Sequence, residues 1–559
     1  MFPSELGGPP ALRPDTVRII PLGGLGDVGR NMTAFEVNGE ILLIDAGVLF
    51  PEQDYPGVDL ILPSFDAIAD RYDDIVGLIL THGHEDHIGA VPYLLKECNS
   101  FPLYGSRLTM GLVDFRLKEH NISSARLMEV REGERITIGT QFDVEFIAMN
   151  HSIPDSLGLF LRTSGGTVLH TGDFKMDQLP LDGRLTDLRA FARFGDEGVD
   201  LFMVDSTNAE VPGFTLGEVE VAPALDQVFD GAQGKIVVAC FASHVHRVQQ
   251  VMDQAKRHGR LVVYVGRSMV RNMGIARDLG FLRVPAGTVA DVSDLDRIPE
   301  DQLVIICTGS QGEPLSALSR MASSNHPSIT VGPSDTVLLA SSLIPGNETA
   351  VHGVMNGLAK LGATVVHKGN ALVHVSGHAS SGELLYCYNL VQPKNVLPVH
   401  GEVRHLIANG NLARSTGVSS VLTVDDGTVI DLKAGVAEVV GKVSAAYVLV
   451  DGTSVGSLSE ESLADRRILG AEGFITVIAV VNLDGQELIS LDIHARGFVE
   501  DANGFADVEP QIVDNLATAL REGVTDPHLL QQIIRRTLGR WVATTLRSRA
   551  MILPVVLPV

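Results

Sequence analysis

The stretch THGHEDHIGA, residues 81–90, places four candidate metal ligands within six positions: His82, His84, Asp86 and His87. The run before it, 75–80, is short, apolar and β-branched, which predicts a buried strand. Residues 88–96 have apolar positions at helical spacing, which predicts a helix. Loops held between such elements often carry function, and imidazole and carboxylate groups suit a cation such as zinc. The alternative is a solvated, histidine-rich turn.

Further candidate ligands follow other short apolar runs. His151 follows the run 144–149, and Asp173 and His400 follow similar runs. A single histidine of this kind is more often a satisfied core residue. Because the pattern of a strand followed by a ligand recurs, the sequence favours one metal site assembled from several strand ends over a polar turn.

The segment between Asp173 and His400 is far too long for a loop. Four runs within it read as buried strands, at 235–240, 260–265, 303–308 and 336–341. Helical patterns lie around 245–258, 268–279 and 347–361. Alternating strands and helices imply a parallel sheet, so we expect a complete α/β domain inserted between the two ligands.

The motif HxHxDH at 82–87, with its later partners, resembles the signature of the metallo-β-lactamase superfamily. That resemblance implies a four-layer αββα sandwich and two divalent metal ions, with zinc favoured and manganese or magnesium as alternatives. It implies that one ion is held by His82, His84 and His151, and the other by Asp86, His87 and His400. Asp173 would bridge them, and Asp45 would orient a ligand histidine.

With the inserted α/β domain and a small C-terminal α+β domain, the chain resembles the β-CASP nucleases and, among these, the bacterial ribonuclease J family. Nearly the whole chain is covered. The matching motifs are PLGGLGDVGRN (21–31), DAGVLFP (45–51), VDSTNAEVPG (204–213), FASHVHRVQQ (241–250), GSQGEP (309–314), HVSGHAS (374–380) and PVHGE (398–402). The resemblance implies a metal-dependent ribonuclease of RNA maturation and decay, including rRNA processing. It would act as a 5′→3′ exonuclease that prefers 5′-monophosphate ends and as an endonuclease.

The same resemblance implies catalytic roles for His378, Asp205 and Asp86. It implies substrate contacts at Ser243, His244, Val245, His374, Val375, Ser376, Gly377 and His378. His244 departs from the family pattern, in which a smaller amide side chain is expected at this position. The capping-box sequence 380–383 predicts a helix start, and backbone N–H groups at a helix start attract phosphate.

Two rival functions remain open on the sequence. One is a hydrolase of a small thioester or lactone, which the inserted domain disfavours. The other is an RNA-binding scaffold with a dead site, which is disfavoured because every ligand is present.

The glycine-rich stretch 24–29 spells GxGxxG and imitates a dinucleotide-binding fingerprint. That fingerprint requires a helix after the glycines. Residues 31–37 instead alternate and run into Asn38-Gly39, a hairpin signal. We therefore expect a tight loop without a nucleotide.

Composition indicates a cytoplasmic enzyme. The 559 residues include 43 Lys and Arg against 68 Asp and Glu, so the net charge of −25 is unusual for an RNA-binding protein. Two divalent cations can nevertheless dominate a narrow cleft. The isolated Cys98, Cys240, Cys307 and Cys387 favour reduced thiols. No apolar run of membrane-spanning length appears, and no N-terminal signal, so we expect no membrane association.

The expected domain order is a flexible N-terminus (1–16), a metallo-β-lactamase domain (17–220, completed by 369–440), a β-CASP domain (221–368), a linker (441–470) and a C-terminal α+β domain (471–559). In the last we expect paired strands at 473–481 and 487–495, two helices and a final strand at 551–559. The resemblance implies that this domain builds a homodimer or homotetramer, with other RNA-decay proteins as further partners. It also implies a structural calcium ion near Leu49, Pro51 and Asp451.

Overall fold

The computed structural model describes residues 7–51, 54–344, 346–497 and 504–559. The chain forms two compact units. The larger unit consists of two stretches of chain, one up to Phe50 and one from Ile61 to Val448. The smaller unit consists of Pro51–Leu60 and Leu449–Val559. Part of the expected flexible N-terminus, 1–6, lies outside the described residues, and 7–16 contains no helix or strand.

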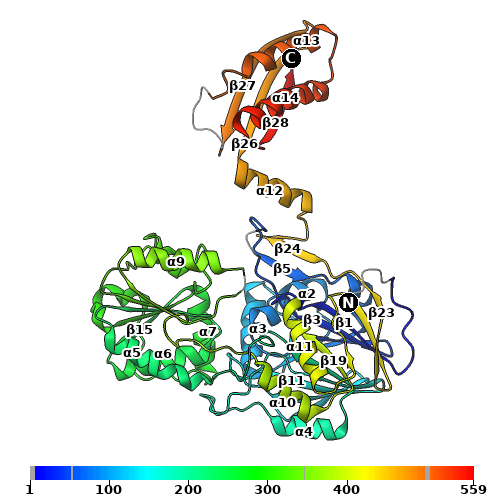
Figure 1. Ribbon diagram of the computed structural model, residues 1–559, viewed down its shortest axis with the longest axis vertical. Coiled ribbons are helices and arrows are strands. Elements are labelled where there is room, and N and C mark those ends of the chain that lie inside the picture. Colours follow the sequence, from blue (N-terminus) through cyan, green and yellow to red (C-terminus); the bar gives the residue numbers. More distant parts are fainter. Residues whose placement is uncertain (1–6, 52–53, 345, 498–503) are drawn as a thin grey trace. The chain divides into compact units, whose positions relative to one another are not determined.

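Two sheets packed face to face form the centre of the larger unit (Figure 1). The eight-stranded sheet has the order β23-β22-β1-β3-β4-β6-β7-β8, and the seven-stranded sheet has the order β21-β19-β13-β12-β11-β10-β9. The strands of the first are β1 (Val17–Gly23), β3 (Met32–Val37), β4 (Glu40–Ile44), β6 (Ile75–Leu80), β7 (Pro102–Gly105), β8 (Arg126–Glu129), β22 (Thr428–Lys433) and β23 (Val436–Lys442). Those of the second are β9 (Arg135–Ile138), β10 (Phe142–Ala148), β11 (Leu157–Thr163), β12 (Gly166–His170), β13 (Leu201–Asp205), β19 (Asn395–Val399) and β21 (Ser420–Val421).

Helices cover the outer faces of this sandwich. On the eight-stranded sheet, α3 (Arg107–Glu119) packs on β7 and β8, next to α2 (Val91–Glu97). On the seven-stranded sheet, α4 (Leu188–Glu197), α10 (Ser381–Val391) and α11 (Val403–Ser415) bury side chains such as Phe191, Leu384 and Ala413 against the strands. The four layers confirm the predicted αββα sandwich.

The predicted strand before the histidine motif is β6, whose IVGLIL side chains are mostly buried. The predicted helix over 88–96 is divided in the structure. A short α1 (Glu85–Ile88) begins inside the motif, and α2 starts three residues later. The glycine-rich loop leads into the β3–β4 hairpin, with Asn38 and Gly39 at positive φ, which confirms the predicted hairpin. A strand thus follows the glycines, where a dinucleotide-binding fingerprint requires a helix.

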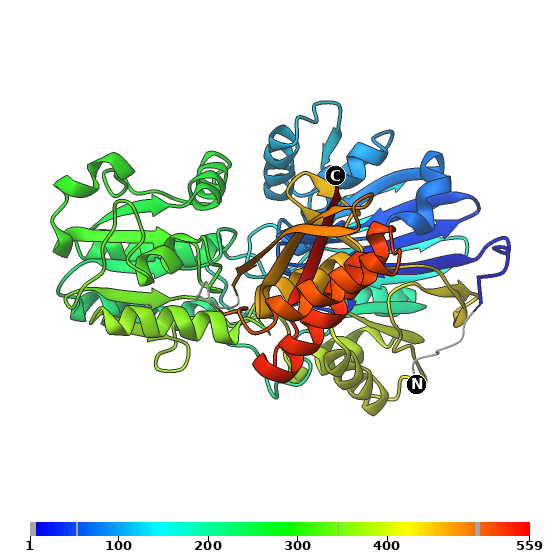
Figure 2. The ribbon, with the colours of Figure 1, turned by 90° about the horizontal axis from the view of Figure 1, so that it is seen from above.

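The inserted domain is a five-stranded parallel sheet with the order β15-β16-β14-β17-β18, and Figure 2 shows helices on both of its faces. Its strands are β14 (Ile236–Ala239), β15 (Leu261–Val265), β16 (Leu303–Cys307), β17 (Thr336–Leu339) and β18 (Thr364–His367). Its helices are α5 (Ala222–Gly231), α6 (Val245–Arg257), α7 (Arg267–Asp278), α8 (Ala317–Ala322) and α9 (Glu348–Lys360). The four predicted strands and three predicted helices are confirmed. The sequence did not indicate β18, because its side chains are half-buried or exposed.

The smaller unit contains the predicted C-terminal α+β fold. Its sheet, β27-β26-β28, is built from β26 (Phe474–Asn482), β27 (Glu487–Arg496) and β28 (Met551–Pro558), with α13 (Glu509–Arg521) and α14 (Pro527–Trp541) packed through a common core. Asp526 caps α14, and Pro527 is its first residue. Residues 441–470, expected as a linker, contain β24 (Tyr447–Asp451), β25 (Ser454–Val455) and most of α12 (Glu460–Glu472).

Short elements complete the fold. They are β2 (Leu25–Gly26), β5 (Leu60–Pro63), β20 (Gly401–Glu402), four 3₁₀ segments at Asp66–Asp74, Glu218–Val221, Val292–Arg297 and Glu300–Gln302, and a π-helical turn at Val542–Leu546.

Candidate metal centre

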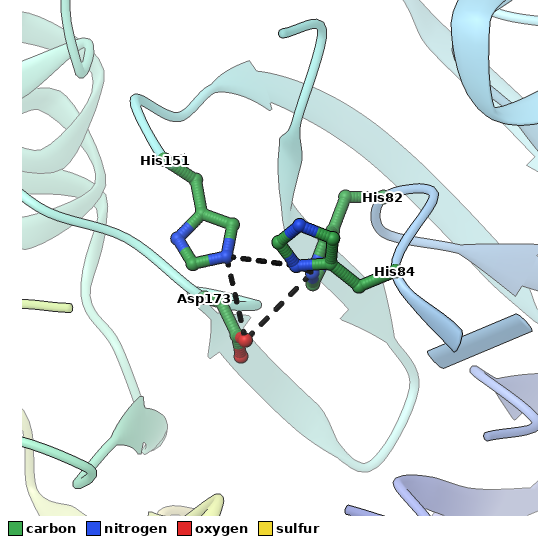
Figure 3. A group of neighbouring side chains, drawn as sticks. All are labelled: His82, His84, His151 and Asp173. Atoms are coloured by element: carbon green, nitrogen blue, oxygen red, sulfur yellow. Dashed lines mark hydrogen bonds and ion pairs between the residues drawn. The ribbon is translucent and has the colours of Figure 1, made fainter. Parts of the chain in front are cut away.

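The histidines of the first predicted ligand group converge on one point (Figure 3). Nδ1 of His84 lies 3.1 Å from Nε2 of His82 and 3.1 Å from Nε2 of His151. Asp173 completes the group, with Oδ2 3.7 Å from Nε2 of His82. Ligands of a tetrahedral zinc ion, at bonds of about 2.05 Å, lie about 3.3 Å apart. The nitrogen separations therefore fit such an ion.

Outer contacts set which ring nitrogens carry protons. Nδ1–H of His151 donates to the Gly377 carbonyl (2.7 Å). The Thr81 hydroxyl donates to Asp45, so its oxygen accepts from Nδ1–H of His82 (3.0 Å). Both rings therefore direct an Nε2 lone pair inward. Burial lowers the pKa of His84 to about 4 and keeps the pKa values of His82 and His151 well below normal. Neutral, converging lone pairs repel one another unless a cation lies between them.

The second predicted group lies beside the first and shares Asp173. Nε2 of His87 is 3.2 Å from Oδ2 of Asp173, and Nε2 of His400 is 3.3 Å from Oδ2 of Asp86. Oδ1 of Asp173 and Nε2 of His400 are buried without a hydrogen-bond partner in the described part of the chain. Burial opposes charge on His87 and His400, yet the adjacent carboxylates raise both pKa values well above normal. The same negative charge favours a divalent cation. The donor set of both groups thus fits two metal ions.

Backbone geometry brings these segments unusually close. Asp45 and His400 both adopt positive φ, at 59° and 53°, which non-glycine residues rarely do. Asp45 accepts a hydrogen bond from Nδ1 of His87 (2.8 Å), in agreement with its expected orienting role. A Cβ on Gly47 would lie 1.6 Å from the Asp86 carbonyl oxygen, so only glycine allows this approach.

His378 and Asp205 form a dyad next to the metal centre. Nδ1 of His378 lies 2.8 Å from Oδ2 of Asp205, which is buried at the end of β13. Burial opposes charge on His378, but the Asp205 carboxylate raises its pKa. The His378 ring lies 5.0 Å from that of His151, measured between centroids. The predicted capping box at the start of α10 is present, with Ser380 N–H donating to Glu383 (2.7 Å).

The predicted substrate contacts occupy two neighbouring segments. His374, Val375, Ser376 and Gly377 lead into His378, and Ser243, His244 and Val245 form the start of α6 in the inserted domain. The His244 and His374 rings meet edge to face at 5.7 Å. Both nitrogens of His244 and Nδ1 of His374 are buried without a hydrogen-bond partner among the described residues. These contacts remain predictions.

Several residues of the site were not predicted. Asn31 Nδ2 donates to the Asp86 carbonyl (3.1 Å) and lies 3.2 Å from Nε2 of His87. Thr207 Oγ1 is 3.0 Å from Nδ1 of His400. Thr81 links Asp45 to His82. All three lie in motifs that stand out in the sequence, at 21–31, 81–90 and 204–213, but nothing local marked them as site residues.

The contacts of Asp451 do not support the expected calcium site. Oδ2 of Asp451 accepts a hydrogen bond from Arg466 (2.5 Å), so the carboxylate already has a cationic partner. The four cysteines are free thiols. Among the described helices, none is both long and apolar enough to cross a bilayer.

Comparison with known families gives four matches along the chain. They are a beta-lactamase superfamily domain (42–218), a "Ribonuclease J, beta-CASP domain" (233–358), a "Zn-dependent metallo-hydrolase RNA specificity domain" (363–422) and a "Ribonuclease J C-terminal domain" (461–559).

Similar proteins include ribonuclease J of Mycolicibacterium smegmatis, 48% identical over all of both chains. Ribonuclease J of Mycobacterium tuberculosis is 49% identical over 99% of this chain and all of its own. That of Thermus thermophilus is 41% identical over 99% of this chain and 96% of its own. A solved structure from Enterococcus faecalis V583, of unknown function, is 15% identical and covers 75% of this chain and all of its own, with a TM-score of 0.53. That last match concerns the fold alone.

Proposed function

The chain belongs to the ribonuclease J family of metal-dependent ribonucleases, and from this premise we propose that it degrades RNA as a 5′→3′ exonuclease preferring 5′-monophosphate ends and also cuts internally. The observation that carries the proposal is the convergence of seven His and Asp side chains on two adjoining points beside a His–Asp dyad. The inserted domain brings the start of α6 next to the loop 374–378, which offers a polymer contacts that a small ester does not need.

We assign one ion to His82, His84 and His151, and the other to Asp86, His87 and His400, with Asp173 between them. Zinc fits the nitrogen-rich first group best, and manganese or magnesium could replace it in the second. Divalent cations held there would supply positive charge that lowers the pKa of an attacking water and offsets charge on the phosphate.

The His378–Asp205 dyad would serve the leaving group. Asp205 accepts Nδ1–H of His378 and thereby directs Nε2 toward the bound phosphodiester. The Asp205 carboxylate raises the pKa of His378, which favours a proton at Nε2 that the imidazole would give to the departing sugar oxygen. Asp205 stabilises the charged ring and fixes its orientation.

Substrate grip would come from the backbone and side chains that flank the dyad. The loop 374–377 directly precedes His378 of the dyad. The start of α6, in the inserted domain, contacts this loop through the His244 and His374 rings. N–H groups at a helix start favour phosphate. A homodimer or homotetramer through the C-terminal domain, contacts with other RNA-decay proteins, and a cytoplasmic location remain parts of the proposal.

The test is removal and restoration of metal. Chelation should abolish cleavage of 5′-labelled RNA, and zinc, manganese or magnesium should restore it, while a small thioester and a lactone remain intact throughout. Asp86→Ala and His82→Ala should likewise abolish RNA cleavage with the fold retained, and the exposed His352→Ala serves as control. Turnover of the thioester or lactone, with RNA left intact, would favour the rival hydrolase. Near wild-type cleavage by either metal-site variant would exclude the two-metal site.

A further inference from the structure

Two aromatic rings lie exposed on the chain segments that flank the His378 loop. Phe214 and Tyr386 are each 56% exposed, and their rings meet edge to face with centroids 5.5 Å apart. Exposing two large rings in contact is costly unless something covers them, because apolar surface is more stable away from water. Only 5% of the residues are aromatic, so such a pair is unusual in this chain.

The pair is held in place by the first turn of α10. Gly382 N–H donates to the Gly213 carbonyl (2.8 Å), and Ser381 N–H donates to that of Val211 (2.9 Å). A Cβ on Gly382 would lie 2.9 Å from Cε2 of Phe214. The ring therefore rests directly on the glycine, one turn before Tyr386. These contacts fix both rings in a defined orientation.

The same loop is bonded to the dyad's backbone. Thr215, next to Phe214, donates its hydroxyl to the His378 carbonyl (2.7 Å), and Asn208 Nδ2 donates to that carbonyl (3.0 Å). Tyr386 lies five residues into α10, about 7.5 Å along its axis. Gly382, on which Phe214 rests, follows His378 by four residues, so their Cα atoms lie at most about 15 Å apart. A few nucleotides of an extended strand span that distance, so a base near a phosphate at His378 can reach the rings.

We propose that Phe214 and Tyr386 form a stacking subsite for the base of a nucleotide flanking the scissile phosphate. The inference rests on the proposed function, because it needs RNA at His378. Aromatic faces accept any base, as required of a nuclease that cuts many sequences. A second copy of the chain is the competing occupant. The base is favoured because the rings belong to the segment that holds His378 in position.

The test pairs protein variants with modified RNA. Phe214→Leu and Tyr386→Leu keep an apolar side chain but remove the ring, and Phe214→Tyr keeps a ring. Phe115→Leu alters another exposed aromatic residue (36% exposed), outside the quoted motifs, as control. The substrates are short 5′-monophosphorylated RNAs with an abasic nucleotide at each position in turn. KM and kcat are measured with the full-length, metal-loaded enzyme.

For the wild-type enzyme, KM should rise about ten-fold when one particular base is removed, as expected for one stacked base. Either leucine variant should raise KM similarly on intact RNA, with a smaller change in kcat, and should add nothing on that abasic RNA. Phe214→Tyr and Phe115→Leu should behave as wild type. Additive effects, or no base-dependent position, would overturn the subsite. A changed oligomeric state with unchanged KM would assign the rings to a second copy. If the wild-type enzyme cleaves no RNA, the proposed function itself fails.

Discussion

At the scale of single residues, His378 offers the sharpest separation of chemistry from metal binding. It contacts Asp205 through Nδ1, and together with Asp173 and His400 these two could form a third ligand group. The two ligand groups assigned above are nevertheless complete without His378. His378→Ala should therefore slow RNA cleavage about 10²–10⁴-fold, the usual contribution of a general acid, while metal content measured by elemental analysis stays at the wild-type level.

Loss of one ion from that variant would make His378 a ligand and would require a new role for His400. Asp205→Asn is the matched partner variant. It keeps the size of the side chain but removes the charge that raises the His378 pKa. Its rate should fall with metal content unchanged, and combining it with His378→Ala should add little, because the two side chains act as one unit.

The candidate ligands that converge in the structure could be picked out from the sequence because their spacing is local and chemically distinctive. His82, His84, Asp86 and His87 share one short stretch, and the other candidate ligands each follow a short apolar strand. Thr81, Thr207 and Asn31 escaped prediction because their contacts arise between segments far apart in the chain, and hydroxyl or amide side chains are common everywhere. All three lie inside quoted motifs, but no local pattern tells which side chains of a motif will contact the candidate ligands before the sheets are assembled.

At the scale of elements, a buried charge cluster joins the hydrolase domain to the inserted one. Arg247 of α6 donates to Glu218 (2.8 Å) and to the carbonyl of Val373, next to the loop 374–378. Lys175, two residues after Asp173, lies 3.4 Å from Glu218. Glu218, Arg247 and Lys175 are almost wholly buried. The cluster therefore ties together the chain segments that carry the metal centre and the dyad.

Glu218→Gln should destabilise the larger unit by about 3–5 kcal/mol, because it leaves two buried cations poorly compensated. Urea unfolding followed by circular dichroism measures this. Asp143→Asn, which removes the exposed Arg135–Asp143 pair, is the matched control and should cost no more than about 1 kcal/mol. A loss for Glu218→Gln as small as that of the control would mean that the cluster is not important for stability.

The pH dependence of this cluster has a definite sign. Burial opposes ionisation of Glu218, but Arg247 and His244 hold its pKa well below normal. A depressed carboxyl pKa contributes stability that is present above the unfolded value of about 4.3 and is lost as pH falls through the folded value. The wild-type protein should therefore lose part of its advantage over Glu218→Gln below about pH 4.3. A difference between the two proteins that stays constant down to pH 3 would contradict the assignment.

At the scale of the whole molecule, the parallel sheet of the inserted domain was predictable because its buried strands are continuous apolar runs. The strand β18 and the elements within 441–470 were not, since exposed strands and polar helices resemble linkers in composition. We propose that the choice of RNA end involves both domains of the larger unit. The hydrolase domain supplies the metal centre, and the inserted domain brings the start of α6 next to the loop 374–378.

Exonuclease action from a 5′ end requires that the terminal phosphate be held at a fixed distance from the metals. Gln311 is not free for this task, because its amide donates to the Ser342 carbonyl (2.8 Å) and accepts from Ile344 N–H (2.9 Å). The Ser243 turn, half-buried at the start of α6, is the better candidate.

A compact pocket of amides and hydroxyls accepts one phosphate but not three. We therefore expect 5′-monophosphorylated RNA to decay about 10- to 100-fold faster than the 5′-triphosphate form, the value of one charge-assisted hydrogen bond. Ser243→Ala should reduce this ratio, while internal cleavage of a circular RNA should be unaffected by the variant. Equal decay rates on matched monophosphate and triphosphate substrates would exclude the pocket, though not the nuclease.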